Sequence, residues 1–167
     1  MDLGSGSGGF LENISSKSKV AIDLSKEMIE LHKKALPNAT YLVANVESGI
    51  PLPSKSIDLV HSSFLIDHIS DLSKFFSEVN RVLKSENNLF LLSYHSPKIM
   101  TKYREEKSFK FKTTKGIEYH IYSDIPNFSS IKKFSSPYFN LLAKKTISML
   151  YDGEKVGFDY LVFGAKK

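Results

Sequence analysis

Hydrophobic positions along the first hundred residues change their spacing in a regular order. Short apolar runs stand at 19–23, 40–44, 57–63 and 88–95, and runs of this length are typical of buried parallel strands. Between them lie stretches in which apolar residues recur every three or four positions, as on one face of a helix. This alternation predicts an α/β fold with a Rossmann-like, doubly wound, mostly parallel sheet and helices on both faces.

Two helices are predicted between these runs. Ser25 can cap the first and Asp71 the second, because both side chains can accept a hydrogen bond from a free backbone N–H group of the first turn. By spacing, the apolar faces consist of Met28, Leu31, His32, Ala35 and Leu36 in the first helix and of Leu72, Phe75, Phe76, Val79 and Leu83 in the second.

After residue 95 the pattern predicts antiparallel strands instead of parallel ones. The segment FKFKTTKGIEYHIY alternates on each side of Gly116, which predicts a hairpin with Phe109 and Phe111 opposite Ile117, Tyr119 and Ile121. A short helix is predicted over FSSIKKF. The final runs LLAKKTISMLY and FDYLVFGA flank DGEKVG and predict an antiparallel strand pair that closes the sheet.

Composition narrows the class of protein. The chain has 167 residues, which is typical of one domain. It has no cysteine, which excludes disulfides, thiolate zinc sites and cysteine nucleophiles. No signal peptide and no membrane-spanning run is evident, so we expect a cytoplasmic protein without a membrane partner.

The net charge of +5 comes almost entirely from scattered lysines, and Arg81 and Arg104 are the only arginines. Arginine binds phosphates and base edges better than lysine does, because its guanidinium group can form two parallel hydrogen bonds. We therefore interpret the lysines as a solvated surface and expect no nucleic-acid partner. His61, His68, His95 and His120 lie on different elements without close ligand spacing, so we expect no metal site.

The chain opens with MDLGSGSGGF, in which Asp2 precedes Gly4, Gly6 and Gly8 at alternate positions. Glycine permits positive φ and lets the backbone approach a ligand. The following FLENI can begin a helix whose free N–H groups favour negative charge. Asp23, at the end of the next apolar run, can accept two hydrogen bonds from a ribose diol. Because the loop also satisfies G-x-G-x-x-G, a nicotinamide-dependent oxidoreductase remains an alternative.

A wider set of motifs favours one family. The glycine loop, VAIDLSKEM, ANVESGIPLPSKSIDLVHSSFLIDHISD and LFLLSYH together resemble the class I S-adenosylmethionine-dependent methyltransferases, in their small-molecule branch. The resemblance runs from Asp2 to about His95. It implies S-adenosyl-L-methionine as cofactor and a small-molecule methyl acceptor. The closing antiparallel pair also resembles that family, whereas a nicotinamide-binding sheet is usually parallel throughout.

The resemblance implies a role for individual positions. The three loop glycines pack against the methionine part of the cofactor, Asp2 holds its amino group through water, and Asp23 binds the ribose hydroxyls. The remaining cofactor contacts are Leu24 and Met28 near the adenine, Asn45 and Val46 at its edge, and Ser62, Ser63 and Phe64 beside the methionine and the sulfonium. The family more often has an acidic residue in place of Asn45, so we expect weaker cofactor binding.

Tyr94 and His95 follow the fourth apolar run, at the sheet edge where open α/β folds bind ligands. We expect them to contact, orient or deprotonate the acceptor, and we name them as the candidate catalytic residues. A single domain over 1–167 then divides into a cofactor-binding half at 1–95, a variable lid at 96–134 and closing strands at 135–167.

The strand that carries the glycine loop is reduced to Met1–Leu3, so the first strand is largely missing. Its neighbours in the sheet would then keep unpaired backbone groups, which are costly when buried. A misplaced start, a fragment of a longer chain, or a non-catalytic relative could each explain this. In the last reading the chain is a binding or partner protein whose sheet is completed by another chain or by a missing N-terminal segment.

Overall fold

The structure is a computed structural model, and it describes residues 1–85, 88–96, 108–112, 118–151 and 154–166. The chain begins with β1 (Asp2–Leu3), η1 (Leu11–Asn13), β2 (Val20–Asp23), α1 (Lys26–Ala35), β3 (Thr40–Val43), η2 (Val46–Ser48), β4 (Leu59–Ser63) and η3 (Ile66–His68). It continues with α2 (Leu72–Val82), β5 (Leu89–His95), β6 (Ser108–Lys112), β7 (Glu118–Tyr122), α4 (Phe128–Ser135), β8 (Phe139–Tyr151) and β9 (Glu154–Ala165).

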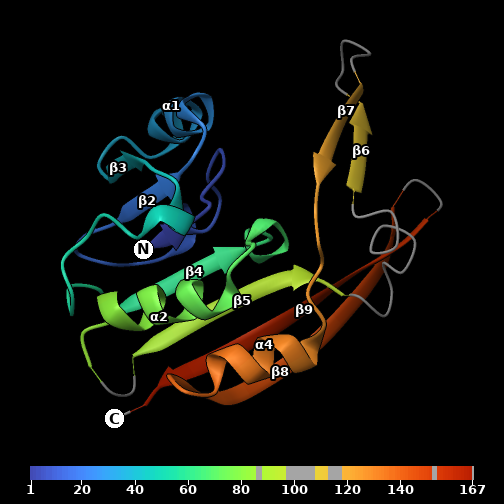
Figure 1. Cartoon of the computed structure of the whole chain (residues 1–167). Helices are drawn as coiled ribbons and strands as arrows, with labels where there is room; N and C mark the ends of the chain where they lie inside the picture. Colours follow the sequence, from blue (N-terminus) through green and yellow to red (C-terminus); the bar gives the residue numbers. More distant parts are fainter. Residues whose placement is uncertain (86–87, 97–107, 113–117, 152–153, 167) are drawn as a thin grey trace.

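Seven of these strands form one sheet in the order β3-β2-β1-β4-β5-β9-β8 (Figure 1). The pairs from β3 to β5 are parallel, and β9 pairs antiparallel with both β5 and β8. The predicted fold class, a mostly parallel Rossmann-like sheet with an antiparallel C-terminal pair, is confirmed. The hairpin of β6 and β7 is confirmed as a separate ladder that places Phe109 opposite Ile121 and Phe111 opposite Tyr119, whereas Ile117 lies outside the described residues.

The first strand is short but central. Asp2 pairs with Ala21 of β2 and with His61 of β4, and the carbonyl of Met1 accepts a further bond from the His61 amide at 2.9 Å. The terminal ammonium of Met1 donates to the carbonyl of Leu59 at 2.8 Å. Over these positions the expectation that both neighbours lose their partners is wrong, because two residues suffice to bridge them.

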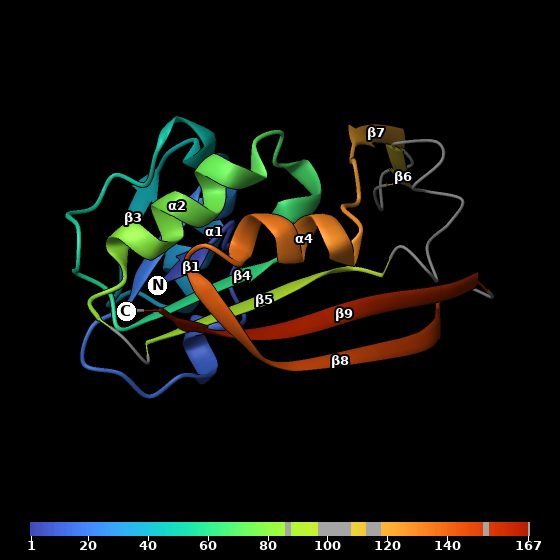
Figure 2. The ribbon, with the colours of Figure 1, turned by 60° about the horizontal axis from the view of Figure 1, so that its bottom comes forward.

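The helices cover the two faces of the sheet unequally. Figure 2 shows α2 and α4 side by side on one face, where they pack on a cluster of phenylalanine rings. Phe76 of α2 is fully buried, and its ring centroid lies 6.1 Å from those of Phe90 in β5 and Phe163 in β9. The predicted stripe of α2 is confirmed at Phe75, Phe76, Val79 and Leu83, which are all buried.

The opposite face is covered by α1 only near β2 and β3. The predicted apolar face of α1 is confirmed at His32, which is buried, but is wrong at Met28 and Leu31, which are 41% and 48% exposed. Ile29, which was not part of the predicted face, is buried. Ser25 caps the helix as predicted, by accepting from the Met28 amide at 3.2 Å. Packing of the His32 ring edge-on against Tyr41 of β3, at 5.2 Å, sets which side of the helix faces the sheet.

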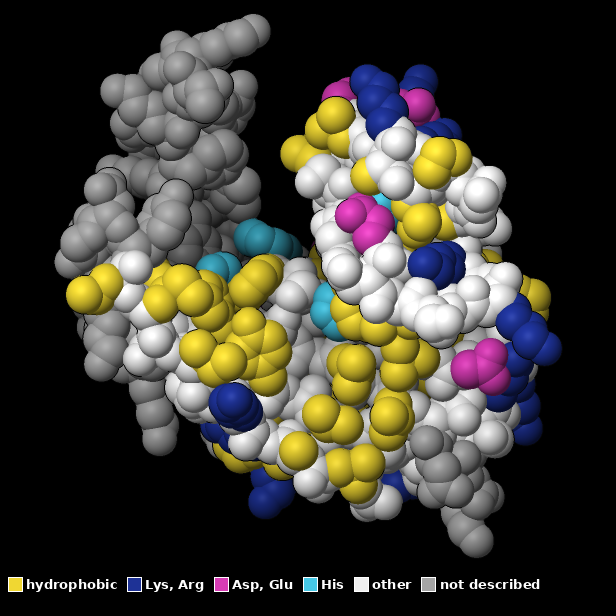
Figure 3. Space-filling view, turned by 180° about the vertical axis from the view of Figure 1, so that it is seen from behind, with side chains coloured by type: hydrophobic (Ala, Val, Ile, Leu, Met, Phe, Trp, Pro, Cys, Tyr) yellow, Lys and Arg dark blue, Asp and Glu magenta, His cyan; other side chains and the backbone are white. Residues whose placement is uncertain are grey.

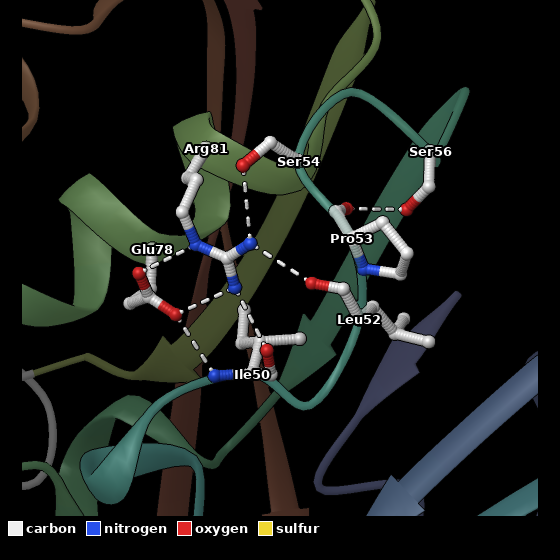
Figure 4. A network of polar contacts seen from close by, with 7 residues as sticks. All are labelled: Ile50, Leu52, Pro53, Ser54, Ser56, Glu78 and Arg81. Carbon is white, nitrogen blue, oxygen red and sulfur yellow. Dashed lines mark hydrogen bonds and ion pairs between the residues drawn. The ribbon is translucent and has the colours of Figure 1, made fainter.

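The loop from η2 to β4 is fastened to α2 by two charged side chains (Figure 4). Arg81 donates to the carbonyls of Ile50 and Leu52, each at 2.8 Å, and to both oxygens of Glu78. Glu78 in turn accepts from the Ile50 amide at 2.9 Å. These bonds lower the pKa of Glu78, chiefly through the hydrogen bond from Arg81. These contacts therefore hold the proline-rich segment against α2.

Candidate functional site

The glycine loop turns tightly after β1 because it is bonded back onto β2. The amides of Gly4 and Ser5 both donate to the carbonyl of Ile22, at 2.8 and 3.1 Å. Gly4, Gly6 and Gly8 have φ of 67°, 52° and 110°, a region that side chains rarely adopt. A Cβ at Gly4 would lie 3.0 Å from Leu65, and one at Gly8 would lie 2.3 Å from the Glu12 carboxylate. Backbone conformation therefore favours glycine at all three positions, and space favours it also at Gly4 and Gly8.

The loop amides do not lie open as a helix N-terminus would. Gly6 donates to Asp23 Oδ2 at 2.8 Å, Gly8 donates to the Ser5 carbonyl at 3.1 Å, and Gly9 donates to Glu12 at 3.1 Å. The predicted helix over FLENI is wrong, because Leu11–Asn13 forms only a single 3-10 turn. The sequence predicts that these backbone amides face a ligand, but in the structure they donate to acceptors within the protein.

Asp23 lies at the carboxyl end of β2, where it fixes the loop. Its two oxygens accept from the amides of Gly6 and Ser25, at 2.8 and 2.9 Å. A carboxylate oxygen can accept more than one hydrogen bond. The same oxygens can therefore also receive the hydroxyls of a diol that enters from the surface.

A hollow of about 140 Å³ lies next to Asp23, and its walls come from four loops at the carboxyl edge of the sheet. Five of the residues predicted to bind the cofactor line it together: Gly4, Asp23, Leu24, Asn45 and Val46. Leu24 is 69% exposed at its mouth, whereas Val46 is buried at its base. The volume is below the ~300–1,000 Å³ typical of whole-ligand pockets, so it suits one part of a ligand, such as a base with its ribose.

Sequence reasoning did not identify the opposite wall of this hollow. Leu65, His68 and Ile69 supply it, from the turn that follows β4. This turn is fastened through Ser70, whose amide and hydroxyl donate to Glu47 of η2 at 2.7 and 2.6 Å. The Ser70 hydrogen bonds lower the pKa of Glu47. The segment FLIDHISD belongs to the third motif of the family resemblance, but the spacing of its residues does not show which side chains line the hollow.

The other residues predicted to bind the cofactor do not line this hollow: Asp2, Gly6, Gly8, Met28, Ser62 and Phe64. The Asp2 carboxylate is 3% exposed and bonds to Nδ1 of His61 at 2.7 Å, and Phe10 stacks on the His61 ring at 3.7 Å. Met28 is exposed on α1 and is absent from the lining of the hollow. Asn45 lines the hollow and also accepts from the Glu47 amide at 2.9 Å, as the cap of η2.

The carboxyl ends of β4 and β5 form the second part of the site. Phe64 has φ of 59°, and its amide donates to the carbonyl of Ser93 at 2.8 Å. The hydroxyls of Ser63 and Ser93 are hydrogen-bonded to each other. Ser62 is fully buried, and its hydroxyl has no hydrogen-bond partner among the described residues.

His95 lies among aromatic rings at this edge. Its centroid is 4.7 Å from that of Phe64 and 5.7 Å from that of Phe158 in β9, and the two phenylalanines are 5.2 Å apart. Nδ1 of His95 lies 2.5 Å from Oδ2 of Asp67, a buried carboxylate that sequence reasoning did not single out. The His95 side chain is 21% exposed, so it remains accessible from the surface.

Tyr94 faces the other side of the sheet, and the structure does not support its predicted contact with an acceptor. Its side chain is fully buried, and its hydroxyl donates to Asp159 of β9 at 3.0 Å. Burial, followed by the charge of Asp159, raises the pKa of the Tyr94 hydroxyl. Successive strand residues point to opposite faces, so Tyr94 is buried while the adjacent His95 is partly exposed on the other face.

A larger hollow, about 800 Å³, lies between the turn after β4, the start of α2 and the segment 124–134. It shares His68 and Ile69 with the smaller hollow. Among the residues that the structure describes, no group of three or more His, Asp or Glu could hold a metal ion, and no helix is long and apolar enough to cross a membrane.

Comparisons with known proteins find methyltransferases among the relatives of this chain. The chain is 29% identical over 104 residues to an uncharacterized methyltransferase, YcgJ, of Bacillus subtilis, covering 58% of this chain and 41% of the relative. It is 35% identical over 91 residues to a malonyl-[acyl-carrier protein] O-methyltransferase of Marinomonas, covering 50% and 33%. The chain thus spans less than half the length of these curated relatives.

Solved structures agree over nearly the whole chain. An S-adenosylmethionine-dependent methyltransferase of Clostridium acetobutylicum superposes with a TM-score of 0.79 at 15% identity, covering 99% of this chain and 83% of that one. A family model described as a methyltransferase domain matches residues 1–91, more than half of the sequence. The chain therefore belongs to the methyltransferase domain family.

Proposed function

We propose that this protein binds S-adenosyl-L-methionine and transfers its methyl group to a small-molecule acceptor. One observation carries the proposal: five residues that come from three separate segments of the chain, and that the family resemblance assigned to one cofactor, line a single hollow. Membership of the methyltransferase domain family supports the same activity. The chain's own residues fit the adenosyl part of the cofactor.

Asp23 would hold the ribose, because its two oxygens stand at the mouth of the hollow and can each accept a further hydrogen bond. The exposed side chain of Leu24 would cover one face of the adenine, and Val46 would support the other. Asn45 would meet the adenine edge through its amide. Because the Asn45 oxygen already caps η2, its acceptor capacity is shared, which is consistent with modest affinity.

Gly4, Gly6 and Gly8 would let the methionine part pass close to the backbone. Their amides are already bonded inside the protein, so their contribution is close approach rather than hydrogen bonding. Asp2 is engaged with His61, and we assign it an electrostatic role toward the cofactor's ammonium. Phe64, held at positive φ, would stand beside the sulfonium, where an aromatic face stabilises a cation.

The bound cofactor supplies an already activated methyl group on a positively charged sulfur. The protein then has to align the acceptor, exclude water and, where the acceptor carries a proton, receive it. His95 is the group placed for the last task, because it adjoins Phe64 and remains partly accessible. Residues 96–134, which we expect to cover the acceptor, lie partly outside the described residues.

A second candidate is a non-catalytic binding or partner protein. The observation that favours it is the open face of β5, β9 and β8, where Leu142, Met149 and Tyr160 are between 40% and 59% exposed. A solved structure that resembles this chain is a complex between the Trm112 methyltransferase activator of Haloferax volcanii and a methyltransferase. A nicotinamide-dependent oxidoreductase is less favoured, because β9 is antiparallel to β5.

Calorimetry with S-adenosylmethionine and S-adenosylhomocysteine tests the proposal. Asp23→Asn keeps the size of the side chain but removes one acceptor oxygen and the charge. We expect it to weaken binding by about 10–100-fold, since hydrogen bonds to a charged group contribute about 1.5–3 kcal/mol. Lys17→Gln, on the exposed loop before β2, is the control and should bind as the native chain does.

Binding of the reduced nicotinamide cofactor in preference to either adenosyl compound would overturn the proposal in favour of the oxidoreductase. Absence of binding by all three, together with capture of a second chain during size-exclusion chromatography, would instead support the partner protein.

A further inference from the structure

Asp67 is buried more completely than any other carboxylate of the candidate site. It is 1% exposed, and its backbone carbonyl accepts from the Asp124 amide at 2.9 Å and from the Ser123 hydroxyl at 3.3 Å. These contacts fix η3 against the chain that follows β7. The backbone of Asp67 is therefore held in place, which limits where its carboxylate can lie.

One oxygen of Asp67 is committed to His95. Oδ2 lies 2.5 Å from Nδ1 of His95 and accepts from the His95 backbone amide at 3.3 Å. A carboxylate oxygen only accepts hydrogen bonds, so Oδ2 accepts from the His95 backbone amide and from Nδ1 alike. The hydrogen between Oδ2 and Nδ1 therefore belongs to the histidine ring. A neutral His95 then carries its hydrogen on Nδ1 and its lone pair on Nε2.

The other oxygen of Asp67 has no structural partner in the described part of the chain. Oδ1 is buried and has no hydrogen-bond partner among the described residues. A buried polar atom without a hydrogen bond costs folding free energy. A side chain that keeps such an atom, and that bonds to the partly exposed His95, points to the chemistry of the site.

We propose that Asp67 is a positioning residue for methyl transfer, which fixes His95 in the tautomer that can accept a proton from the acceptor. The inference rests on the proposed function. The acceptor's proton passes to Nε2 of His95, the acceptor's freed electron pair forms the new bond to the methyl carbon, and the pair of the broken carbon–sulfur bond stays on sulfur. The substrate class that needs such a pair is one that must lose a proton, such as a hydroxyl or an acidic C–H group.

Nitrogen-15 NMR of the histidine rings tests this without any acceptor. The His95 signals are assigned by their loss in His95→Gln and are measured at a pH at which the ring is neutral. We expect the native chain to show the Nδ1–H tautomer. Asp67→Ala should convert the ring to the Nε2–H tautomer that is favoured in water, and Asp67→Asn, which keeps an acceptor oxygen, should retain the native tautomer.

Asp71→Asn is the matched control, because it makes the same change four residues away at the cap of α2 and asparagine caps helices equally well. The Nε2–H tautomer in the native chain, or an unchanged tautomer in Asp67→Ala, would overturn the inference. Should Asp67→Ala fail to fold, the tautomer of the native chain and of Asp67→Asn still decides. The Asp67 variants should bind S-adenosylhomocysteine with unchanged affinity in calorimetry. This measurement tests the proposed cofactor, whereas the tautomer tests the role of Asp67, so the two hypotheses can fail separately.

Once an acceptor is known, steady-state kinetics distinguishes a role of Asp67 in proton transfer from a role in acceptor binding. Loss of the positioning carboxylate should lower kcat by about 10–100-fold and leave KM nearly unchanged, since general-base catalysis contributes about 10²–10⁴-fold. A change confined to KM would contradict a role in proton transfer.

Discussion

The two faces of the sheet are built on different principles. Under α2 and α4 the rings of Phe75, Phe76, Phe90, Phe139 and Phe163 pack against one another at centroid distances of 5.6–6.3 Å. On the other face, beyond α1, hydrophobic side chains gather over the sheet in contact with solvent (Figure 3). The aromatic cluster thus lies on one face of the sheet, whereas the second face leaves apolar surface without a described cover.

The largest effect should come from the packed face. Phe76→Ala removes a fully buried ring that contacts four other rings. Such truncations typically lower the free energy of unfolding by about 3–5 kcal/mol, a large fraction of a domain's total of about 5–15 kcal/mol. Urea unfolding followed by circular dichroism measures this. A loss below 1 kcal/mol would show that the ring cluster does not hold the fold.

The next effect concerns the loop fastened to the same face. Arg81→Ala breaks its bonds to Glu78, Ile50 and Leu52, and we expect a loss of about 2 kcal/mol from bonds that involve a charged group. Because Arg81 lowers the pKa of Glu78, the native interaction is present above the carboxyl's unfolded pKa and is lost as pH falls through its folded value. The variant should therefore lose less stability than the native chain between pH 5 and 3, and equal slopes would contradict this.

A smaller effect is expected where α2 begins. Asp71 accepts from the Lys74 amide at 2.9 Å, as the cap of the helix. Asp71→Ala should lower the free energy of unfolding by about 1 kcal/mol, the usual value for a lost cap. Asp71→Asn provides the comparison and should restore most of this energy in the same urea titration. Equal stability of the two variants would assign the effect to charge instead of capping.

The smallest effect should come from the open face. Met149 is 51% exposed at the edge strand β8, so Met149→Ser should change the free energy of unfolding by no more than about 0.5 kcal/mol, as surface substitutions usually do. It should also reduce self-association at high concentration, because it removes exposed apolar surface. Light scattering checks this. Destabilisation comparable with Phe76→Ala would mean that the two faces do not differ.

Much of the fold could be predicted from the sequence, because the local signals agreed with it. The caps Ser25 and Asp71 and the stripe from Phe75 to Leu83 are encoded by neighbours in the chain. The phase of α1 was not predictable, because the side that faces the sheet is chosen by His32 and Tyr41, which meet only in the folded chain.

The candidate site divides in the same way. Gly4, Asp23, Leu24, Asn45 and Val46 were predictable, because each follows directly after a recognisable strand or belongs to the glycine motif. Asp67 and Phe158 were not, because their relevance depends on contact with His95 from another strand. Tyr94 was named beside His95, and only the alternation of β5 separates the buried side chain from the accessible one.

The central claim is that the hollow beside Asp23 receives the adenosyl group. A crystal structure of this chain with S-adenosylhomocysteine tests it most directly. The account predicts the ribose hydroxyls on the Asp23 carboxylate and the adenine between Leu24 and Val46. Adenosine bound elsewhere, for example in the larger hollow beside Asp124, with the Asp23 carboxylate touching only Gly6 and Ser25, would contradict it.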